Sequence, residues 1–273
     1  MNRQHVITAL LLSVLSFTSA YAQPEQAMPV TSAAISPSSP TVAGVQPIAI
    51  VLVHGAFADG SSWLPVIAIL QQRGYHVTAV QNPLTSLDDD VQATLKVIAR
   101  QHGEVLLVGH SWAGAVISQA GNDARVHGLV YLSALVPNSG ESVSALLARL
   151  HAPMTGLAPD AQGLIWLDQP DMYAKVMAAD LPPATARQLA AVQQPIAARA
   201  FGDKVAHAAW HDKPGWYLVT DGDQALPTSV QQCLASQIRA TTTVIRSSHL
   251  SMQSQPQAVA ALIEQAASSL QQR

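Results

Sequence analysis

The chain has 273 residues, of which 49% are hydrophobic and 11% are charged, and its formal net charge is −3. This length fits one α/β domain, and the apolar fraction is large enough for an extensive core. The net charge is slightly negative, no basic patch in the sequence suggests a nucleic-acid partner, and no acidic block suggests an acidic tail.

The first 46 residues are expected to lie outside the folded domain. An apolar stretch over 6–17 is followed by Ala20-Tyr21-Ala22, a small-residue cleavage site. Residues 1–22 are therefore predicted to be a signal peptide cut after Ala22, too short for a permanent membrane anchor. We expect a secreted or periplasmic protein, the alternative being an uncleaved, tethered N-terminus. Residues 23–46, rich in Pro, Ser and Ala, are predicted to form a disordered tether.

From residue 47 to 273 strand patterns alternate with helix patterns. Short apolar runs predict strands at 48–53, 76–80, 105–108, 128–133, 215–220 and 241–245. Helical periodicity predicts helices at 63–73, 87–102, 115–120, 227–237 and 256–270. This alternation predicts the α/β class with a doubly wound, mostly parallel sheet.

The alternation stops between about residue 137 and residue 214. No convincing strand pattern occurs there, and short helices are predicted at 142–150, 170–177, 183–191 and, more weakly, 203–207. We predict a helical cap over the carboxyl-terminal edge of the sheet. Large apolar residues of this segment are candidates for a pocket lining, although packing inside the cap is their commoner role. These candidates are Trp166, Met172, Tyr173, Met177, Phe201 and Trp210.

Cys233 is the single cysteine of the chain, so no intramolecular disulfide can form. It lies in a predicted amphipathic helix. We expect a buried, unreactive thiol.

Residues 105–114 predict a strand, a sharp turn and a helix, with Ser111 at the tip of the turn. This is the pattern of a nucleophile elbow, which is usually G-x-S-x-G. Small neighbours are needed because the tip residue is strained and the helix packs closely beneath it. Here Ala113 stands in the last glycine position, and Gly114 follows one residue later.

A serine hydroxyl becomes a nucleophile when a base takes its proton and an acid orients that base. Ser111, Asp223 and His249 each follow a different predicted strand, in the order serine, acid, histidine. Asp221 shares the turn with Asp223 and is the alternative acid. His110, beside the nucleophile, is expected to have a packing role.

An acyl-transfer site also needs backbone N–H groups that stabilise the developing oxyanion. One predicted donor is Trp112, directly after the nucleophile. The other is Ala56, in the loop after the first strand of the domain, where the small Gly55 allows close backbone approach.

These motifs resemble the esterase and hydroxynitrile-lyase branch of the α/β-hydrolase superfamily, the branch that includes plant methylesterases. The matching motifs are Val51-Leu52-Val53-His54-Gly55-Ala56, Gly109-His110-Ser111, Ser133-Ala134-Leu135-Val136-Pro137, Thr220-Asp221-Gly222-Asp223 ahead of Leu226-Pro227, and Ser248-His249. The resemblance implies an α/β-hydrolase fold, with Asp223 as the acid and Ala56 in the oxyanion hole. Leu250 stands where the lyases carry Lys, and the strand at 51–53 lacks their Thr, so the resemblance favours ester hydrolysis.

We therefore expect a serine esterase that cleaves small, largely apolar carboxylic esters through an acyl-enzyme. It would need no metal or organic cofactor, and its partner would be a small-molecule ester. Lactonase, carbon–carbon lyase and cofactor-free oxygenase chemistry remain alternatives on the same scaffold. A non-catalytic ligand-binding homologue is a further alternative, and the sequence leaves the oligomeric state open.

Overall fold

The computed structural model describes residues 48–152 and 156–272. The predicted signal peptide and tether lie outside these described residues. Within them, no helix combines the length and the apolar character needed to cross a membrane.

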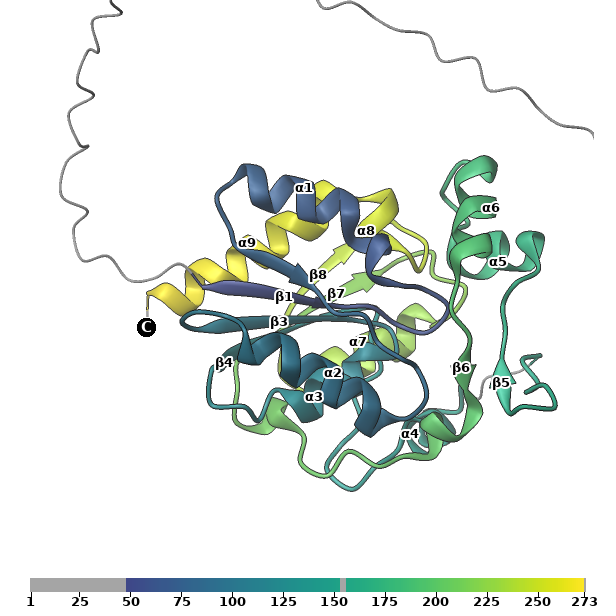
Figure 1. Ribbon diagram of the computed structural model, residues 1–273, viewed down its shortest axis with the longest axis horizontal. Helices are drawn as coiled ribbons and strands as arrows, with labels where there is room; N and C mark the ends of the chain where they lie inside the picture. The colour runs from purple at the N-terminus through teal and green to yellow at the C-terminus, as the bar shows by residue number, and fades with distance from the viewer. Residues whose placement is uncertain (1–47, 153–155, 273) are drawn as a thin grey trace, which may run out of the picture. The chain divides into compact units, whose positions relative to one another are not determined.

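Six parallel strands form one sheet, in the order β2-β1-β3-β4-β7-β8 (Figure 1). The strands are β1 (Ala49–Val53), β2 (Val77–Ala79), β3 (Val105–His110), β4 (Val126–Leu132), β7 (Gly215–Thr220) and β8 (Thr241–Ile245). Every residue of β1 and β3 is buried, which explains the continuous apolar runs at 49–53 and 105–108. The predicted α/β fold with a doubly wound parallel sheet is confirmed.

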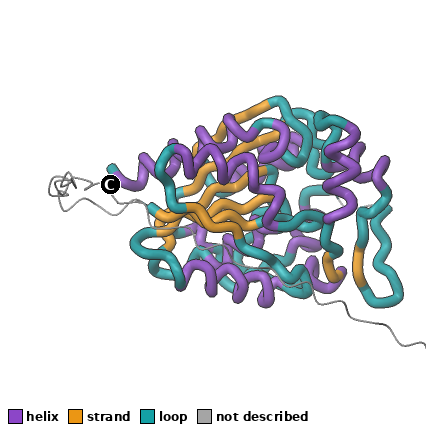
Figure 2. The backbone as a smooth tube through the Cα atoms, turned by 45° about the horizontal axis from the view of Figure 1, so that its top comes forward, coloured by secondary structure: helices purple, strands orange, loops and turns teal. Residues whose placement is uncertain are grey.

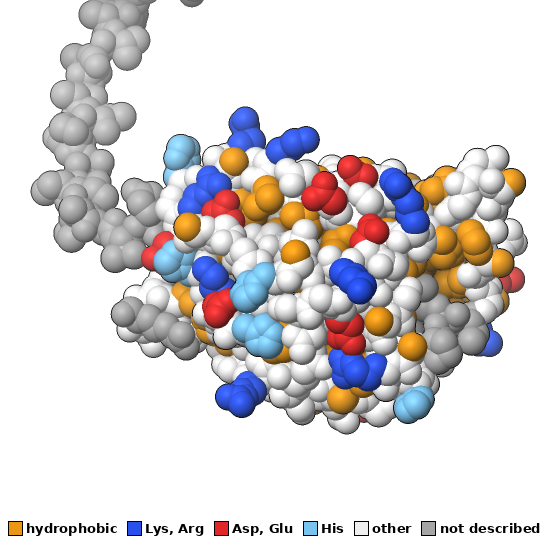
Figure 3. Space-filling view, turned by 90° about the horizontal axis from the view of Figure 1, so that it is seen from below, with side chains coloured by type: hydrophobic (Ala, Val, Ile, Leu, Met, Phe, Trp, Pro, Cys, Tyr) orange, Lys and Arg blue, Asp and Glu red, His pale blue; other side chains and the backbone are white. Residues whose placement is uncertain are grey.

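Helices cover both faces of this sheet, as Figure 2 shows with the strands enclosed between helical layers. On one face, α1 (Leu64–Gln72), entered through the 3₁₀ helix η1 (Gly60–Trp63), packs on α9 (Pro256–Gln271), with the short α8 (Ser251–Ser254) beside them. On the other face, α2 (Leu87–Ala99) packs on α3 (Ala113–Ala120). On the face that Figure 3 presents, acidic and basic side chains are interspersed.

The helix α2 shows why these segments form where they do. Its N-cap Ser86 accepts a hydrogen bond from the Asp89 N–H, and three aspartates in the first turn suit the positive end of the helix dipole. One of them, Asp90, is fully buried.

The chain between β4 and β7 forms a separate group of short elements beside the carboxyl ends of the strands (Figure 1). Its helices are α4 (Val143–Arg149), α5 (Pro170–Met177), α6 (Pro183–Val192) and the 3₁₀ helices η2 (Ala198–Gly202) and η3 (Ala209–His211). Proline at the first turn of α5 and of α6 begins each helix without losing a backbone hydrogen bond.

Two expectations for this segment are wrong. It contains two short antiparallel strands, β5 (Leu164–Ile165) and β6 (Ile196–Ala197). Two residues are too few to show a strand period in the sequence. The predicted helix at 203–207 is absent from the described chain, because the Val205 N–H donates to the Glu141 carbonyl and the Gly140 N–H donates to the Val205 carbonyl.

Cys233 is also a correction, since it is exposed rather than buried. It lies on α7 (Thr228–Gln237), whose buried face carries Val230, Gln231 and Leu234. A polar residue, Gln231, therefore occupies the buried stripe in place of the cysteine.

Candidate active site

The elbow between β3 and α3 holds Ser111 in a left-handed backbone conformation, with φ = 54°. Its N–H donates to the Leu132 carbonyl at 3.1 Å, and its carbonyl accepts from the N–H groups of Gly114 and Leu135, each at 3.0 Å. Three backbone bonds from three directions fix this otherwise unfavourable conformation. Ser111 is thereby held at the carboxyl end of β3, where it is half-buried and lines a cavity.

Close packing around the elbow explains the departure at Ala113. A methyl group on Gly114 would lie 2.3 Å from the Leu135 carbonyl oxygen, and one on Gly109 would lie 2.8 Å from the Ala113 carbonyl oxygen. Ala113 itself is fully buried with its methyl group accommodated. The closest approach of the helix to the neighbouring chain therefore falls at position 114, where the sequence has its glycine.

Asp223 and His249 form a buried pair at the ends of β7 and β8. His249 Nδ1 lies 2.7 Å from Asp223 Oδ2, and their side chains are 2% and 0% exposed. An ionised carboxylate can only accept, so the proton is on Nδ1 and Nε2 is left free for another partner. Asp223 is one of the two candidate acids; the other, Asp221, is exposed.

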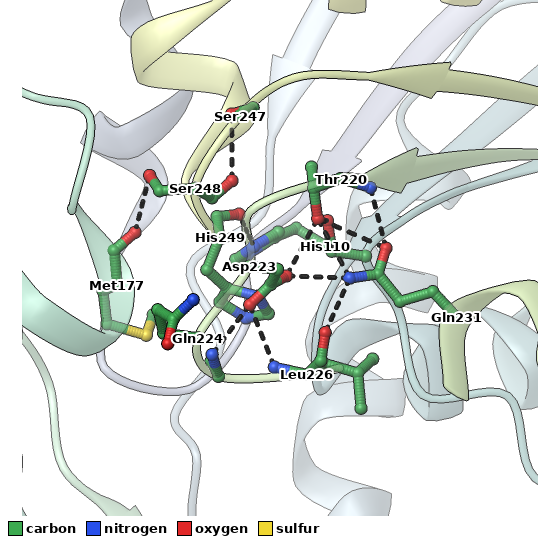
Figure 4. A network of polar contacts seen from close by, with 12 residues as sticks. His110, Met177, Thr220, Asp223, Gln224, Leu226, Gln231, Ser247, Ser248 and His249 are labelled. Atoms are coloured by element: carbon green, nitrogen blue, oxygen red, sulfur yellow. Dashed lines mark hydrogen bonds and ion pairs between the residues drawn. The ribbon is translucent and has the colours of Figure 1, made fainter. Parts of the chain in front are cut away.

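Further donors surround the Asp223 carboxylate (Figure 4). Oδ1 accepts from the N–H groups of Ala225 and Leu226 at 2.8 and 2.9 Å, and Oδ2 accepts from the Thr220 hydroxyl at 2.9 Å. Burial by itself raises the pKa of Asp223, but the nearby His249 and these hydrogen bonds outweigh it and hold the pKa below its ordinary value. The carboxylate is therefore ionised at neutral pH.

Gln231 completes this network, although it was not predicted from the sequence as a residue of the site. Its Nε2 donates to Asp223 Oδ2 at 3.0 Å and to the Leu226 carbonyl at 2.8 Å, and its Oε1 accepts from the Thr220 N–H at 2.9 Å. The available signal was a glutamine next to Val230 in the apolar stripe of a predicted helix. A fully buried amide needs partners, and here the partners lie in the turn that carries Asp223.

His110 supports His249 from behind. Its Nε2 lies 2.9 Å from the His249 carbonyl oxygen, and the two rings are 4.6 Å apart, tilted by 56°. Complete burial, together with the nearby His249, holds the pKa of His110 well below its ordinary value. The neutral ring thus fixes the backbone of His249 as well as filling space.

Two residues of the segment between β4 and β7 also hold the loop around His249. The Met177 carbonyl accepts from the Leu250 N–H at 3.0 Å. It also accepts from the Ser248 hydroxyl at 3.2 Å, as Figure 4 shows. The Asp180 carboxylate accepts from the Ser248 N–H at 3.0 Å and from its hydroxyl. Both neighbours of His249 are therefore bonded to this segment.

Ser111 and His249 line one cavity of about 380 Å³. Its walls are almost entirely apolar and include Ala56, Phe57, Trp112, Leu135, Leu147, Leu167, Met172, Val176, Met177, Phe201, Leu226 and Pro227. No Lys, Arg, Asp or Glu lines the cavity in the described part of the chain. Such walls suit an uncharged, apolar ligand.

Ala56 and Trp112, the predicted oxyanion donors, both line this cavity. Over residues 48–152 and 156–272, neither backbone N–H donates to a backbone or side-chain acceptor. Gly55 brings their loops together, because a methyl group on it would lie 2.8 Å from Ser111 Cβ.

The apolar candidates of the segment divide into two groups. Met172, Met177 and Phe201 line the cavity. The others bond elsewhere: the Tyr173 hydroxyl donates to the Phe57 carbonyl, the Trp166 indole to Asp160, and the Trp210 indole to the Pro137 carbonyl. Among the residues that the structure describes, no cluster of three His, Cys, Asp or Glu side chains could hold a metal ion.

Comparison with known sequences agrees with the fold. A profile of the alpha/beta hydrolase family matches residues 50–262. The chain belongs to this family. An alpha/beta hydrolase from Aspergillus novofumigatus is 28% identical over 243 residues, which cover 80% of this chain and 96% of the relative. A carbendazim hydrolyzing esterase from a Nocardioides species is 32% identical over 117 residues, which are 38% of this chain and 48% of that esterase.

Solved structures of the esterase branch share the fold. Polyneuridine aldehyde esterase superposes with a TM-score of 0.71 at 18% identity, over 81% of this chain and 99% of the other. A pyrethroid hydrolase superposes with a TM-score of 0.68 at 22% identity, over 83% and 99% of the two chains. The resemblance to the esterase branch of α/β hydrolases is thus confirmed at the level of fold and family.

Proposed function

We propose that this α/β hydrolase is a serine esterase that cleaves small, apolar carboxylic esters through an acyl-enzyme. The observation that carries the proposal is the buried Asp223–His249 pair, whose histidine lines the same apolar cavity as Ser111 at its strained elbow. The names of two relatives, a carbendazim hydrolyzing esterase and a pyrethroid hydrolase, support ester hydrolysis.

In the proposed reaction His249 Nε2 removes the proton of the Ser111 hydroxyl as its oxygen attacks the ester carbonyl. Asp223 keeps the His249 proton on Nδ1 and stabilises the imidazolium that forms. The alcohol leaves with the proton from Nε2, and a water molecule activated by His249 then releases the acid from Ser111.

The negative oxygen of each tetrahedral intermediate is stabilised by the N–H groups of Ala56 and Trp112. Both residues line the cavity, and in the described chain neither N–H group donates to a protein acceptor, which leaves both free to donate to a ligand oxygen. None of these steps calls for a metal or an organic cofactor.

The apolar cavity supports neutral substrates in preference to charged ones, because a charged group would lose its hydration without gaining a counter-ion. The predicted signal peptide at residues 1–22 supports a secreted or periplasmic site of action. The substrate is then a small ester that reaches the protein outside the cytoplasm.

Ser111→Ala tests the proposal with short p-nitrophenyl esters. Turnover is expected to fall to the rate of the buffer, while thermal unfolding stays near that of the wild type. Ser144→Ala, an exposed serine on α4, is the matched control and is expected to keep full activity. Wild-type turnover in Ser111→Ala would refute the assignment, and a wild type inactive on esters, lactones and amides would favour a ligand-binding role.

A further inference from the structure

Asp90 is a buried carboxylate that the proposed reaction does not use. It lies in the first turn of α2 and is 0% exposed. Over residues 48–152 and 156–272, no Lys, Arg or His forms an ion pair with it. Burial raises its pKa to about 6, and two N–H donors offset only part of the lost hydration. The Asp90 carboxylate therefore interacts with the rest of the protein through those two hydrogen bonds.

One donor is the indole of Trp112, whose Nε1 lies 2.7 Å from Asp90 Oδ2. Trp112 directly follows Ser111 and supplies one of the two proposed oxyanion donors. Trp112 is 1% exposed and lines the cavity, and its ring meets that of Phe201 edge to face, with the ring centroids 5.3 Å apart. Because the side chain leaves the backbone between the strained elbow and the start of α3, the position of the ring and that of the N–H are linked.

The other donor is the Leu84 N–H, 2.7 Å from Asp90 Oδ1. Leu84 has φ = 57°, and its carbonyl accepts from the Ala197 N–H of β6 at 2.9 Å. The strand β6 leads directly into η2, which carries Phe201. The two oxygens of Asp90 therefore connect to the same wall of the cavity from two sides, through Trp112 and through β6.

We propose that Asp90 is a positioning residue for the oxyanion site. Its carboxylate holds the Trp112 indole, and with it the Trp112 N–H and the wall formed with Phe201, in the geometry that receives the oxyanion. The inference rests on the proposed function, since an oxyanion forms only if the protein transfers acyl groups. A carboxylate accepts from both donors at once, whereas a carboxamide has one accepting oxygen.

Asp90→Asn, Trp112→Phe and the double variant test this role with a p-nitrophenyl ester. We expect kcat to fall about tenfold in each single variant, with KM changed less than about threefold, because the interaction matters in the transition state. The double variant is expected to be no slower than the slower single variant, since both changes remove the same hydrogen bond, the one between Asp90 and the Trp112 indole. Asp89→Asn removes a neighbouring exposed carboxylate of the same helix turn and is expected to leave kcat within about twofold of the wild type.

Three results would overturn the role of Asp90. The first is a wild-type kcat in Asp90→Asn. The second is a loss of kcat in the double variant equal to the product of the two single losses. The third is a fall in KM and kcat that Asp89→Asn shows to the same extent as Asp90→Asn. If Asp90→Asn does not fold, Trp112→Phe decides, because it removes the same hydrogen bond from the other partner, and an unchanged kcat there overturns the inference. A wild type without esterase activity contradicts the proposed function instead, so the two failures are distinguishable.

Discussion

Replacing Asp223 by Asn keeps the shape of the turn and changes the chemistry of His249. Asp223 Oδ1 accepts from two backbone N–H groups, at Ala225 and Leu226, so the single oxygen of an asparagine is held there. The amide nitrogen then faces His249 Nδ1 at the position of Oδ2, 2.7 Å away. Because that nitrogen donates, the imidazole must carry its proton on Nε2 and can no longer accept the proton of Ser111.

A wrong tautomer of this kind costs on the order of 10⁴ in kcat, or about 5.5 kcal/mol in activation free energy. The amide nitrogen also meets Gln231 Nε2, itself a donor, so we expect a loss of unfolding free energy of about 1–3 kcal/mol. Initial rates on p-nitrophenyl butyrate and urea unfolding measure the two effects. Asp221→Asn, in the same turn but exposed, is the matched control and is expected to retain the wild-type rate. A variant Asp223→Asn with more than a tenth of the wild-type kcat would refute the reasoning, and a large loss in Asp221→Asn would make Asp221 the acid.

Three further predictions concern stability and the loop around His249. Gly114→Ala is expected to lower the unfolding free energy by about 3 kcal/mol, because the new methyl group meets a backbone carbonyl, whereas Ala113→Gly changes it by less than about 1 kcal/mol; equal urea midpoints would contradict this. The raised pKa of Asp90, about 6, means that the folded state holds this proton more tightly than the unfolded state, so the contribution of Asp90 to stability improves as pH falls from 7.5 to 5. The unfolding free energy of the wild type, relative to that of Asp90→Asn, should therefore increase by about 1 kcal/mol as the pH falls over that range. Urea titrations measure this difference, and a difference that stays constant with pH would contradict the raised pKa. Asp180→Asn replaces one of the two Asp180 carboxylate oxygens that accept from Ser248, and it is expected to lower kcat about threefold to tenfold with unchanged KM; full activity would show that the loop around His249 keeps its position without this carboxylate.

The fold could be predicted because its signals are local and strong. Runs such as 105–108 are apolar throughout, which marks strands buried on both faces, and glycine or capping residues bound the helices between them. Parallel strands end at one edge of the sheet, so Ser111, Asp223 and His249 could be expected near one another from their places in the chain alone.

The parts that sequence reasoning missed depend on contacts between distant segments. The pairing of β5 with β6 joins Leu164 to Ala197 through two residues on each side, too few to leave a pattern. Residues 203–207 form no helix because their backbone bonds to the chain near Glu141. Such pairings are decided by tertiary packing.

Buried polar residues on helices were the other omission. Gln231 and Asp90 interrupt apolar stripes, and their partners lie on other elements. Gln231 bonds to the turn that carries Asp223, and Asp90 bonds to Trp112 at the elbow. The burial of Cys233 was predicted wrongly for the same reason, since its helix buries Gln231 instead. A polar residue in an apolar stripe predicts an internal partner, but the sequence does not say which one.

The most direct test of the central claim is covalent capture of the nucleophile. The chain is incubated with an alkyl fluorophosphonate, and intact mass and peptide mapping locate the adduct. We predict one adduct per chain, on Ser111, formed in step with the loss of ester hydrolysis and absent from Ser111→Ala. An adduct on another serine, or ester hydrolysis that continues in the fully labelled protein, would contradict the account.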